Sequence, residues 1–145
     1  MQRLLLTVLI VGFFLPWIGC GEKNHGTVPV SITITQKGSP LAGATVTIIS
    51  SDGKGHSAGG RTDSSGTASL QTPERWKGAL PGEYVVAVKK WVGETVPDPT
   101  DDSPDATRTD QKNVLPAKYG EHTSSGFQLT VGNKASHATF DIGEE

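Results

Sequence analysis

Hydrophobic and polar residues alternate with a period of two along much of the chain after residue 27. In the segment 28–35, Val28, Val30, Ile32 and Ile34 alternate with Pro, Ser and Thr. Successive side chains of a β-strand point to opposite faces, so this pattern predicts a strand with one buried face. Similar alternation, or short runs rich in β-branched residues, predicts four more strands, at 44–49, 83–91, 127–131 and 136–142, and two further short strands are expected at 57–62 and 67–71, on either side of a tight turn.

Turn-forming residues separate the predicted strands, and signals for helices are nearly absent. The segments 57–62 and 67–71 flank the sequence Asp-Ser-Ser-Gly at 63–66, so we expect them to pair as a hairpin. In the strand 83–91, alternate residues from Tyr84 onward are expected to face the core. Seven short strands with turns between them predict an all-β protein with a seven-stranded β-sandwich of two antiparallel sheets.

Residues 92–125 break this rhythm. Their first part is acidic and rich in proline, with Asp98, Asp101, Asp102 and Asp105 close together, and it is expected to be disordered or loosely ordered. Residues 114–119 carry enough apolar side chains to pack back onto the sandwich. Because long connections in compact domains are usually functional or disordered, the 92–125 loop is the predicted partner-facing surface.

The first twenty residues have the layout of an export signal. Arg3 precedes an apolar run at 4–15, and the run is shorter than the roughly 20 residues that a membrane-spanning helix needs. Cys20, the single cysteine of the chain, follows Gly19 at the end of this segment. A lone cysteine in an exported domain forms no internal disulfide, so a different use of its thiol is expected.

The sequence Trp-Ile-Gly-Cys at 17–20 resembles the bacterial lipobox, although Trp17 stands where the family usually has Leu. The resemblance implies cleavage between Gly19 and Cys20 and lipidation (palmitate) of Cys20. Residues 1–19 would then be a lipoprotein signal peptide, 20–27 the lipidated tether and 28–143 the domain. The protein would be anchored to a membrane of the bacterial cell envelope and face the periplasm or the cell surface, and several acyl chains make such attachment effectively permanent.

Composition narrows the function classes. Removing the signal leaves about 125 residues, which suffice for one core. The net charge of the chain is −2, and no basic stripe is present that would neutralise phosphates, so we expect no nucleic-acid partner.

Three segments resemble the carboxypeptidase regulatory-like domain, a transthyretin-like, Ig-like Greek-key sandwich of the prealbumin type. They are 38–47, 62–66 and 80–84, and the sequence Leu-Pro-Ala-Lys-Tyr at 115–119 further resembles small bacterial lipoproteins that carry this domain. The resemblance covers nearly all of the mature chain. It implies a non-catalytic accessory or interaction module without a cofactor, and we expect a monomer.

Other candidate chemistry is sparse. Residues 55–59 match the G-x-S-x-G pattern around a nucleophilic serine, with Ser57 at its centre, but that pattern works only at a strand-to-helix turn of a larger fold. The aspartates of the 92–125 loop could bind calcium, but no EF-hand pattern is present, and a solvated acidic loop is the favoured interpretation. The four histidines lack ligand spacing, so no metal is expected.

Trp76, Trp91 and Tyr119 form the last candidate site, because exposed aromatic rings could make a platform for a sugar, whereas buried ones would fill the core. The favoured hypothesis is a non-catalytic, lipid-anchored envelope protein that presents its sandwich for contact with a protein or glycan or for a structural role. The alternatives are a carbohydrate-binding module that uses Trp76 or Trp91 and a minor serine hydrolase at Ser57.

Overall fold

The computed structural model describes residues 25–52, 54, 56–101 and 103–143. The signal segment 1–19, Cys20 and most of the tether lie outside the described residues. The elements are β1 (Val30–Gln36), β2 (Ser39–Pro40), β3 (Thr45–Ser50), β4 (Ser57–Arg61), β5 (Thr67–Ser69), β6 (Gly82–Lys89), β7 (Trp91–Pro97), β8 (Thr107–Asn113), a 3-10 helix η1 (Ala117–Gly120), β9 (Phe127–Val131) and β10 (Ser136–Ile142).

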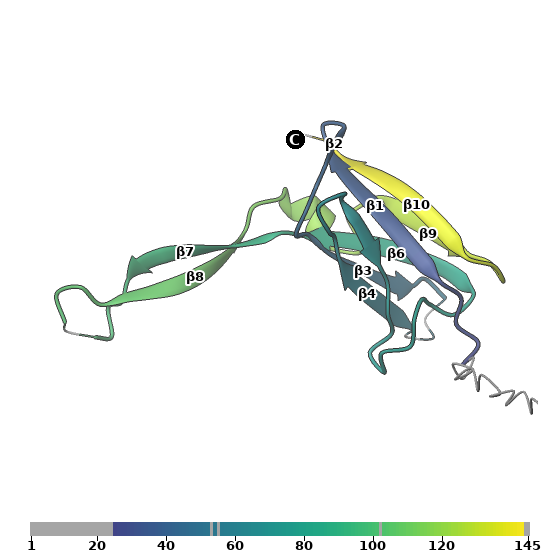
Figure 1. The fold of residues 1–145 in the computed structure, drawn as a ribbon, viewed down its shortest axis with the longest axis horizontal. Helices are drawn as coiled ribbons and strands as arrows, with labels where there is room; N and C mark the ends of the chain where they lie inside the picture. The colour runs from purple at the N-terminus through teal and green to yellow at the C-terminus, as the bar shows by residue number, and fades with distance from the viewer. Residues whose placement is uncertain (1–24, 53, 55, 102, 144–145) are drawn as a thin grey trace, which may run out of the picture.

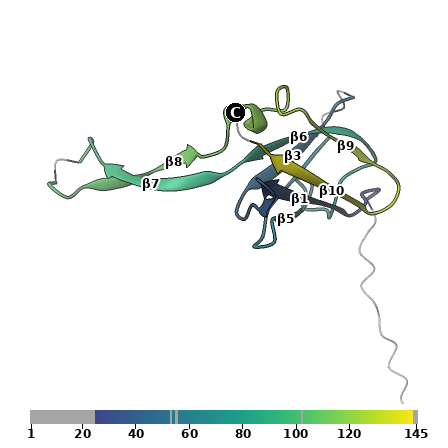
Figure 2. The same cartoon turned by 90° about the horizontal axis from the view of Figure 1, so that it is seen from above.

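The chain is all-β in its described part, as predicted, and two four-stranded sheets make up its body (Figures 1 and 2). In the first sheet, β1 lies between β10 on one side and β2 and β5 on the other. The second sheet has the order β4-β3-β6-β9 and is antiparallel throughout. Side chains of both sheets contribute to one hydrophobic core, which is the arrangement of a β-sandwich.

The predicted alternation is confirmed in the three strands where it was clearest. The inward residues of β1 are Val30, Ile32 and Ile34, and they are at most 4% exposed. The same holds for Val46 and Ile48 in β3, and for alternate residues of β6 from Tyr84 onward. Each of these strands has one face against the core, and that burial produces the period of two in the sequence.

The expected hairpin of 57–62 with 67–71 does not form as a strand pair, and a single antiparallel bridge between Gly59 and Gln71 joins the two segments. β4 pairs with β3, whereas β5 pairs with β1 in the other sheet, so the turn at 63–66 crosses between the sheets. Gly66 lies directly on β1: its carbonyl accepts a hydrogen bond from the Ile34 amide (2.8 Å), and a Cβ on Gly66 would be 2.6 Å from the Ile34 oxygen. With φ at +77°, this position requires glycine, and its contact with β1 directs β5 there.

The first sheet is not purely antiparallel either. β1 and β10 run parallel, with Val30 opposite Ser136 and Gln36 opposite Ile142. Parallel neighbours need a long connection, and here nearly the whole domain lies between the two strands.

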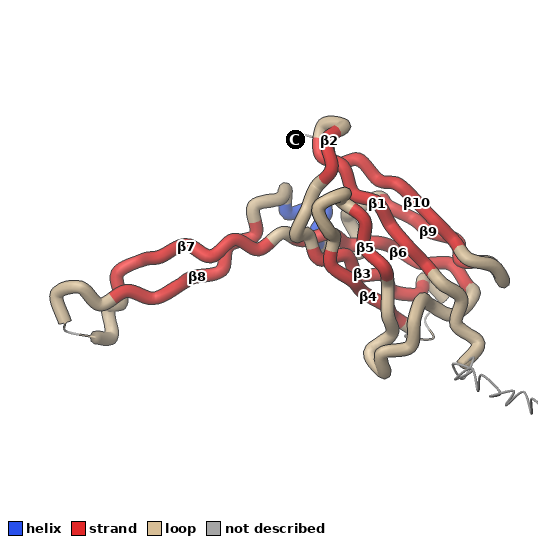
Figure 3. Tube along the Cα trace, viewed as in Figure 1, coloured by secondary structure: helices blue, strands red, loops and turns tan. Residues whose placement is uncertain are grey.

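The 92–125 segment is not the loosely ordered loop that the sequence suggested. β7 and β8 pair over seven residues each and form a two-stranded ribbon that projects from the sandwich (Figure 3). η1 then returns the chain to the body, where Leu115 and Tyr119 are buried in the core, as expected for 114–119. The ribbon was missed because both of its faces are solvated, so it carries no hydrophobic alternation.

Candidate functional site

The chain enters the sandwich beside the loop that joins β5 to β6. The ring of His25 stacks on Trp76 with 3.9 Å between centroids, and Val28 exchanges two backbone hydrogen bonds with Ala79. Gly78, at φ +87°, packs so closely that a Cβ would overlap the carbonyl oxygen of Val28. The tether therefore joins the body at the end where β6 begins, and we call this the tether end.

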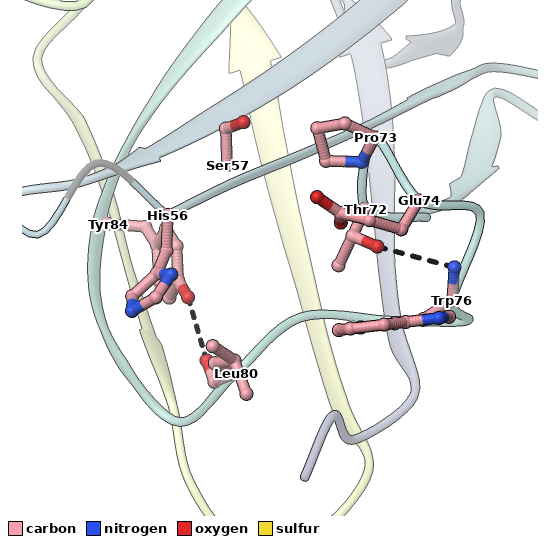
Figure 4. Close-up of a pocket in the computed structure, with 8 residues that line it drawn as sticks. All are labelled: His56, Ser57, Thr72, Pro73, Glu74, Trp76, Leu80 and Tyr84. Carbon is pink, nitrogen blue, oxygen red and sulfur yellow. Dashed lines mark hydrogen bonds between the residues drawn. The ribbon is translucent and has the colours of Figure 1, made fainter. Parts of the chain in front are cut away.

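A pocket of about 260 Å³ opens at the tether end (Figure 4). The backbone amide of Trp76 donates to the Thr72 hydroxyl (3.3 Å), and the Tyr84 hydroxyl donates to the Leu80 carbonyl (2.8 Å). Burial, and then the charge of Asp52, raise the pKa of Tyr84. The residues that line the pocket are His56, Ser57, Thr72, Pro73, Glu74, Trp76, Leu80 and Tyr84.

Ser57 lies in this pocket, but not in the setting that a serine nucleophile needs. It is the first residue of β4 and pairs with Ile49 of β3. A nucleophile elbow requires a sharp turn from a strand into a helix, and here a strand follows the serine. The backbone at Ser57 is therefore the start of a β-strand and not a nucleophile elbow.

The three aromatic residues proposed as a platform do not lie together. Tyr119 is 8% exposed and stacks on Phe127 with 5.2 Å between ring centroids, so it belongs to the core. Trp76 is half-buried at the tether end, whereas Trp91 follows the opposite end of β6 and is 47% exposed. Trp76 lines the same pocket as Tyr84, near the start of β6. The extended chain from Tyr84 to Trp91 spans about 23 Å, so the two tryptophans cannot contact one ligand ring.

The ribbon has two chemically different faces. Residues directly opposite each other in β7 and β8 share a face. The charged face holds Glu94 and, on β8, Arg108 and Asp110, whose side chains form an ion pair (3.0 Å). The other face is uncharged; its members are Trp91, Gly93, Thr95, Pro97, Thr107, Thr109, Gln111 and Asn113.

The base of the ribbon carries exposed apolar side chains on both of its faces. Among the described residues the large hydrophobic side chains classed as exposed are Trp91, Val92 and Val114, at 44–49%. Val114 donates its backbone N–H to Lys90, so the base of the ribbon continues the pairing of β7 and β8. Trp91 lies on the uncharged face and Val92 on the charged face, so these side chains do not form one apolar patch.

The aspartates at the tip of the ribbon hold its turn together. Asp98 accepts hydrogen bonds from the hydroxyl and the amide of Thr100, and these lower the pKa of its carboxyl group. Asp101 accepts from the amide of Ser103, with the same effect on its pKa. Asp105 is exposed, and Asp102 lies outside the described residues. These side chains explain why an acidic segment forms an ordered turn.

The histidines are dispersed. His25 stacks on Trp76, His56 lines the tether-end pocket, and the His137 ring nitrogen Nδ1 shares a hydrogen bond with Ser31 (3.0 Å). Within the described part of the chain, no three His, Cys, Asp or Glu side chains are grouped as a metal site would require.

Comparisons with known proteins add little to this description. No protein-family model matches the chain, and no curated protein matches it. One solved structure with a partial likeness is a 9R-lipoxygenase from Cyanothece PCC8801, with a TM-score of 0.39 and 12% sequence identity. The match covers 83% of this chain and 17% of the lipoxygenase chain, and a likeness at this level carries no argument.

No helix in the described ranges is both long and apolar enough to span a bilayer.

The feature that sequence reasoning missed is the ribbon. The available signal was a pair of segments of equal length, each with β-branched residues, on either side of the turn-rich stretch 98–106.

Proposed function

We propose that this protein is a non-catalytic, lipid-anchored protein of the bacterial cell envelope, whose sandwich holds the β7–β8 ribbon out for contact with a protein or a glycan. The observation that carries the proposal is the position of Cys20. It follows an apolar segment with the layout of an export signal, and only four residues separate it from His25, which stacks on Trp76 of the body. A diacylglyceryl group on Cys20 would anchor the domain permanently.

The tether enters the body and the ribbon leaves it at opposite ends of β6, and this placement supports a partner-facing role for the ribbon. The chain enters beside Trp76 near the start of β6, whereas β7 begins directly after β6 ends (Figure 1). An anchor on the tether would therefore leave the ribbon at the far end of the body. Seven residues of strand extend about 23 Å beyond the sandwich.

The finer fold assignment belongs to the same proposal. Of the eight strands in the two sheets, seven correspond to the predicted ones, and β2 is a two-residue addition. We assign them to the seven-stranded Greek-key plan of the carboxypeptidase regulatory-like, transthyretin-like domain. Its support is the sequence resemblance at 38–47, 62–66 and 80–84 together with the presence of two facing sheets.

A carbohydrate-binding role is the second candidate, because Trp91 offers an exposed indole on the uncharged face of the ribbon. Aromatic rings with polar neighbours suit the apolar faces and hydroxyl groups of sugars. The test measures tryptophan fluorescence while soluble envelope polysaccharide is added. Quenching in the wild type and in the matched control Trp76→Phe, but not in Trp91→Phe, would support this role.

The test of the anchor uses the full-length chain expressed in a bacterium. Wild-type protein is expected to incorporate radioactive palmitate and to fractionate with membranes, whereas Cys20→Ser should do neither. A wild-type protein without label, or a Cys20→Ser variant that stays in the membrane fraction, would contradict the proposal.

A further inference from the structure

The β7–β8 ribbon is incomplete as a free structure. None of its fourteen strand residues is buried, and within the described part of the chain β7 and β8 pair only with each other. An isolated two-stranded hairpin is marginally stable in water, and a third strand or a packed face stabilises it. A third strand added to one of the open edges would therefore stabilise the ribbon.

In each strand of the ribbon, alternate residues direct their backbone N–H and C=O groups toward the other strand, and the residues between them direct these groups outward. Val114 donates to Lys90 and Asp98 donates to Ala106, so the even-numbered residues of β8 direct their backbone groups toward β7. Its odd-numbered residues, Thr107, Thr109 and Gln111, direct N–H and C=O groups outward.

The outer edge of β7 is less suited to pairing. Its outward positions include Gly93, which weakens a strand, and Pro97, which has no N–H to donate. In the body, the outer edge of β4 is partly closed, because Gly59 and Gln71 exchange two backbone hydrogen bonds. The outer edge of β8 has neither interruption.

We propose that β8 pairs antiparallel with β8 of a second copy of this chain, about a two-fold axis at Thr109. In this register Arg108 lies opposite Asp110 of the partner subunit, and the symmetry produces the pair twice. Thr107 lies opposite the partner's Gln111, and both lie in the outward hydrogen-bonding phase. Opposite charges across a strand pair are favourable, and an isologous interface of this kind closes as a dimer.

Neighbouring registers match less well. An axis at Asp110 would place Asp110 opposite itself and Arg108 opposite Lys112 of the partner subunit, which are like charges. An axis at Gln111 would pair Asp110 with the partner's Lys112 but leave Arg108 opposite the partner's Val114. Within one chain the Arg108 guanidinium already donates two hydrogen bonds to Asp110 of the same strand. The axis at Thr109 places two such pairs side by side, so that each guanidinium lies next to the carboxylates of both its own Asp110 and Asp110 of the partner subunit.

The dimer would convert two marginal ribbons into one four-stranded sheet with the order β7-β8-β8-β7. It goes beyond the proposed function, because it needs neither the lipid nor an envelope partner. It also replaces the monomer expected from the sequence.

Charge reversal tests the register. The full-length chain is studied in detergent by sedimentation velocity over a range of concentrations, and the wild type is expected to dimerise. Arg108→Asp should weaken the dimer about tenfold, because two attractive pairs become repulsive. The double variant Arg108→Asp/Asp110→Arg should restore it. Lys112→Glu changes the net charge by the same amount as Arg108→Asp and should have little effect.

Cross-linking tests the edge. Membranes or detergent solutions that contain Thr109→Cys protein should give a covalent dimer with a short bis-maleimide. Thr95→Cys, directly across the ribbon on the β7 edge, should not, and wild type reports any contribution from Cys20. A monomeric wild type, equal weakening by Lys112→Glu and Arg108→Asp, or cross-linking through Thr95→Cys instead would overturn the proposal.

Discussion

The sandwich and the ribbon are both built from short β-strands, but different interactions hold them together. In β1, β3 and β6 alternate side chains are buried, and Ile32, Ile48 and Val86 are fully inaccessible. In β7 and β8 no side chain is buried, and the strands depend on cross-strand hydrogen bonds and on the tip turn ordered by Asp98 and Asp101. Burial of apolar side chains thus stabilises the strands of the sandwich strongly and those of the ribbon only weakly.

The largest effect that separates the two regions should come from truncating an apolar side chain. Ile48→Ala removes buried methyl and methylene groups from the core, and a loss of about 2–5 kcal/mol in the free energy of unfolding is expected. Val92→Ala, at an exposed ribbon position, should change it by less than about 0.5 kcal/mol. Urea titration of both variants measures the difference, and equal losses would mean that the ribbon has a packed face.

The next effect concerns a buried hydroxyl. Thr62 Oγ1 donates to the Leu41 carbonyl (2.6 Å) and accepts from the Ala44 amide (2.8 Å). Thr62→Val keeps the shape but leaves both backbone groups unsatisfied, so we expect a loss of about 1–3 kcal/mol. Thr95→Val on the exposed β7 strand of the ribbon is the control, and thermal unfolding compares the two. Similar melting temperatures would show that water reaches Thr62.

A smaller effect should appear in acid. The Ser65 hydroxyl, followed by the Thr67 and Ser65 amides, hydrogen-bonds the Asp63 carboxylate and lowers its pKa from the ordinary 3.8. This stabilisation is complete above the unfolded-state pKa and is lost as the pH falls through the lower folded-state value. Asp63→Asn should therefore be less stable than wild type at neutral pH, and the gap should narrow in acid. A gap that is independent of pH would contradict this account.

The smallest effect should be a gain in the ribbon. Glu94 lies directly opposite Asp110, and like charges in that position destabilise a strand pair. Glu94→Lys should therefore stabilise the ribbon by about 0.2–1 kcal/mol. Slower hydrogen exchange of β7 and β8 amides, with unchanged exchange in β3, would be the signature. Glu94→Gln should give part of the gain, and unchanged ribbon exchange in both variants would refute it.

The sequence predicted those parts of the fold in which one face of a strand is buried. β1, β3 and β6 follow from alternation because burial selects side chains at every second position. The ribbon could not be predicted in this way, because neither of its faces is selected for apolar residues. The partner of β5 was also beyond reach, because the residues at 63–66 specify a turn but not that Gly66 packs against Ile34.

The candidate site was predictable only in outline. All three candidates are large aromatic residues, yet Trp76 lines a pocket, Trp91 is exposed and Tyr119 is in the core. Their separation depends on where the ends of β6 lie, which is a property of the assembled sheets. The segment expected to face partners, 92–125, contains the ribbon, and its contact role stays a prediction.

The parallel pairing of β1 with β10 has a consequence for the time course of synthesis. Val30 pairs with Ser136, so one edge of β1 lacks its neighbour until almost all of the polypeptide has left the ribosome, whereas β2 and β5 on the other edge are made much earlier. Contacts between such distant residues close slowly. A nascent chain stopped before Ser136 would therefore expose one edge of β1.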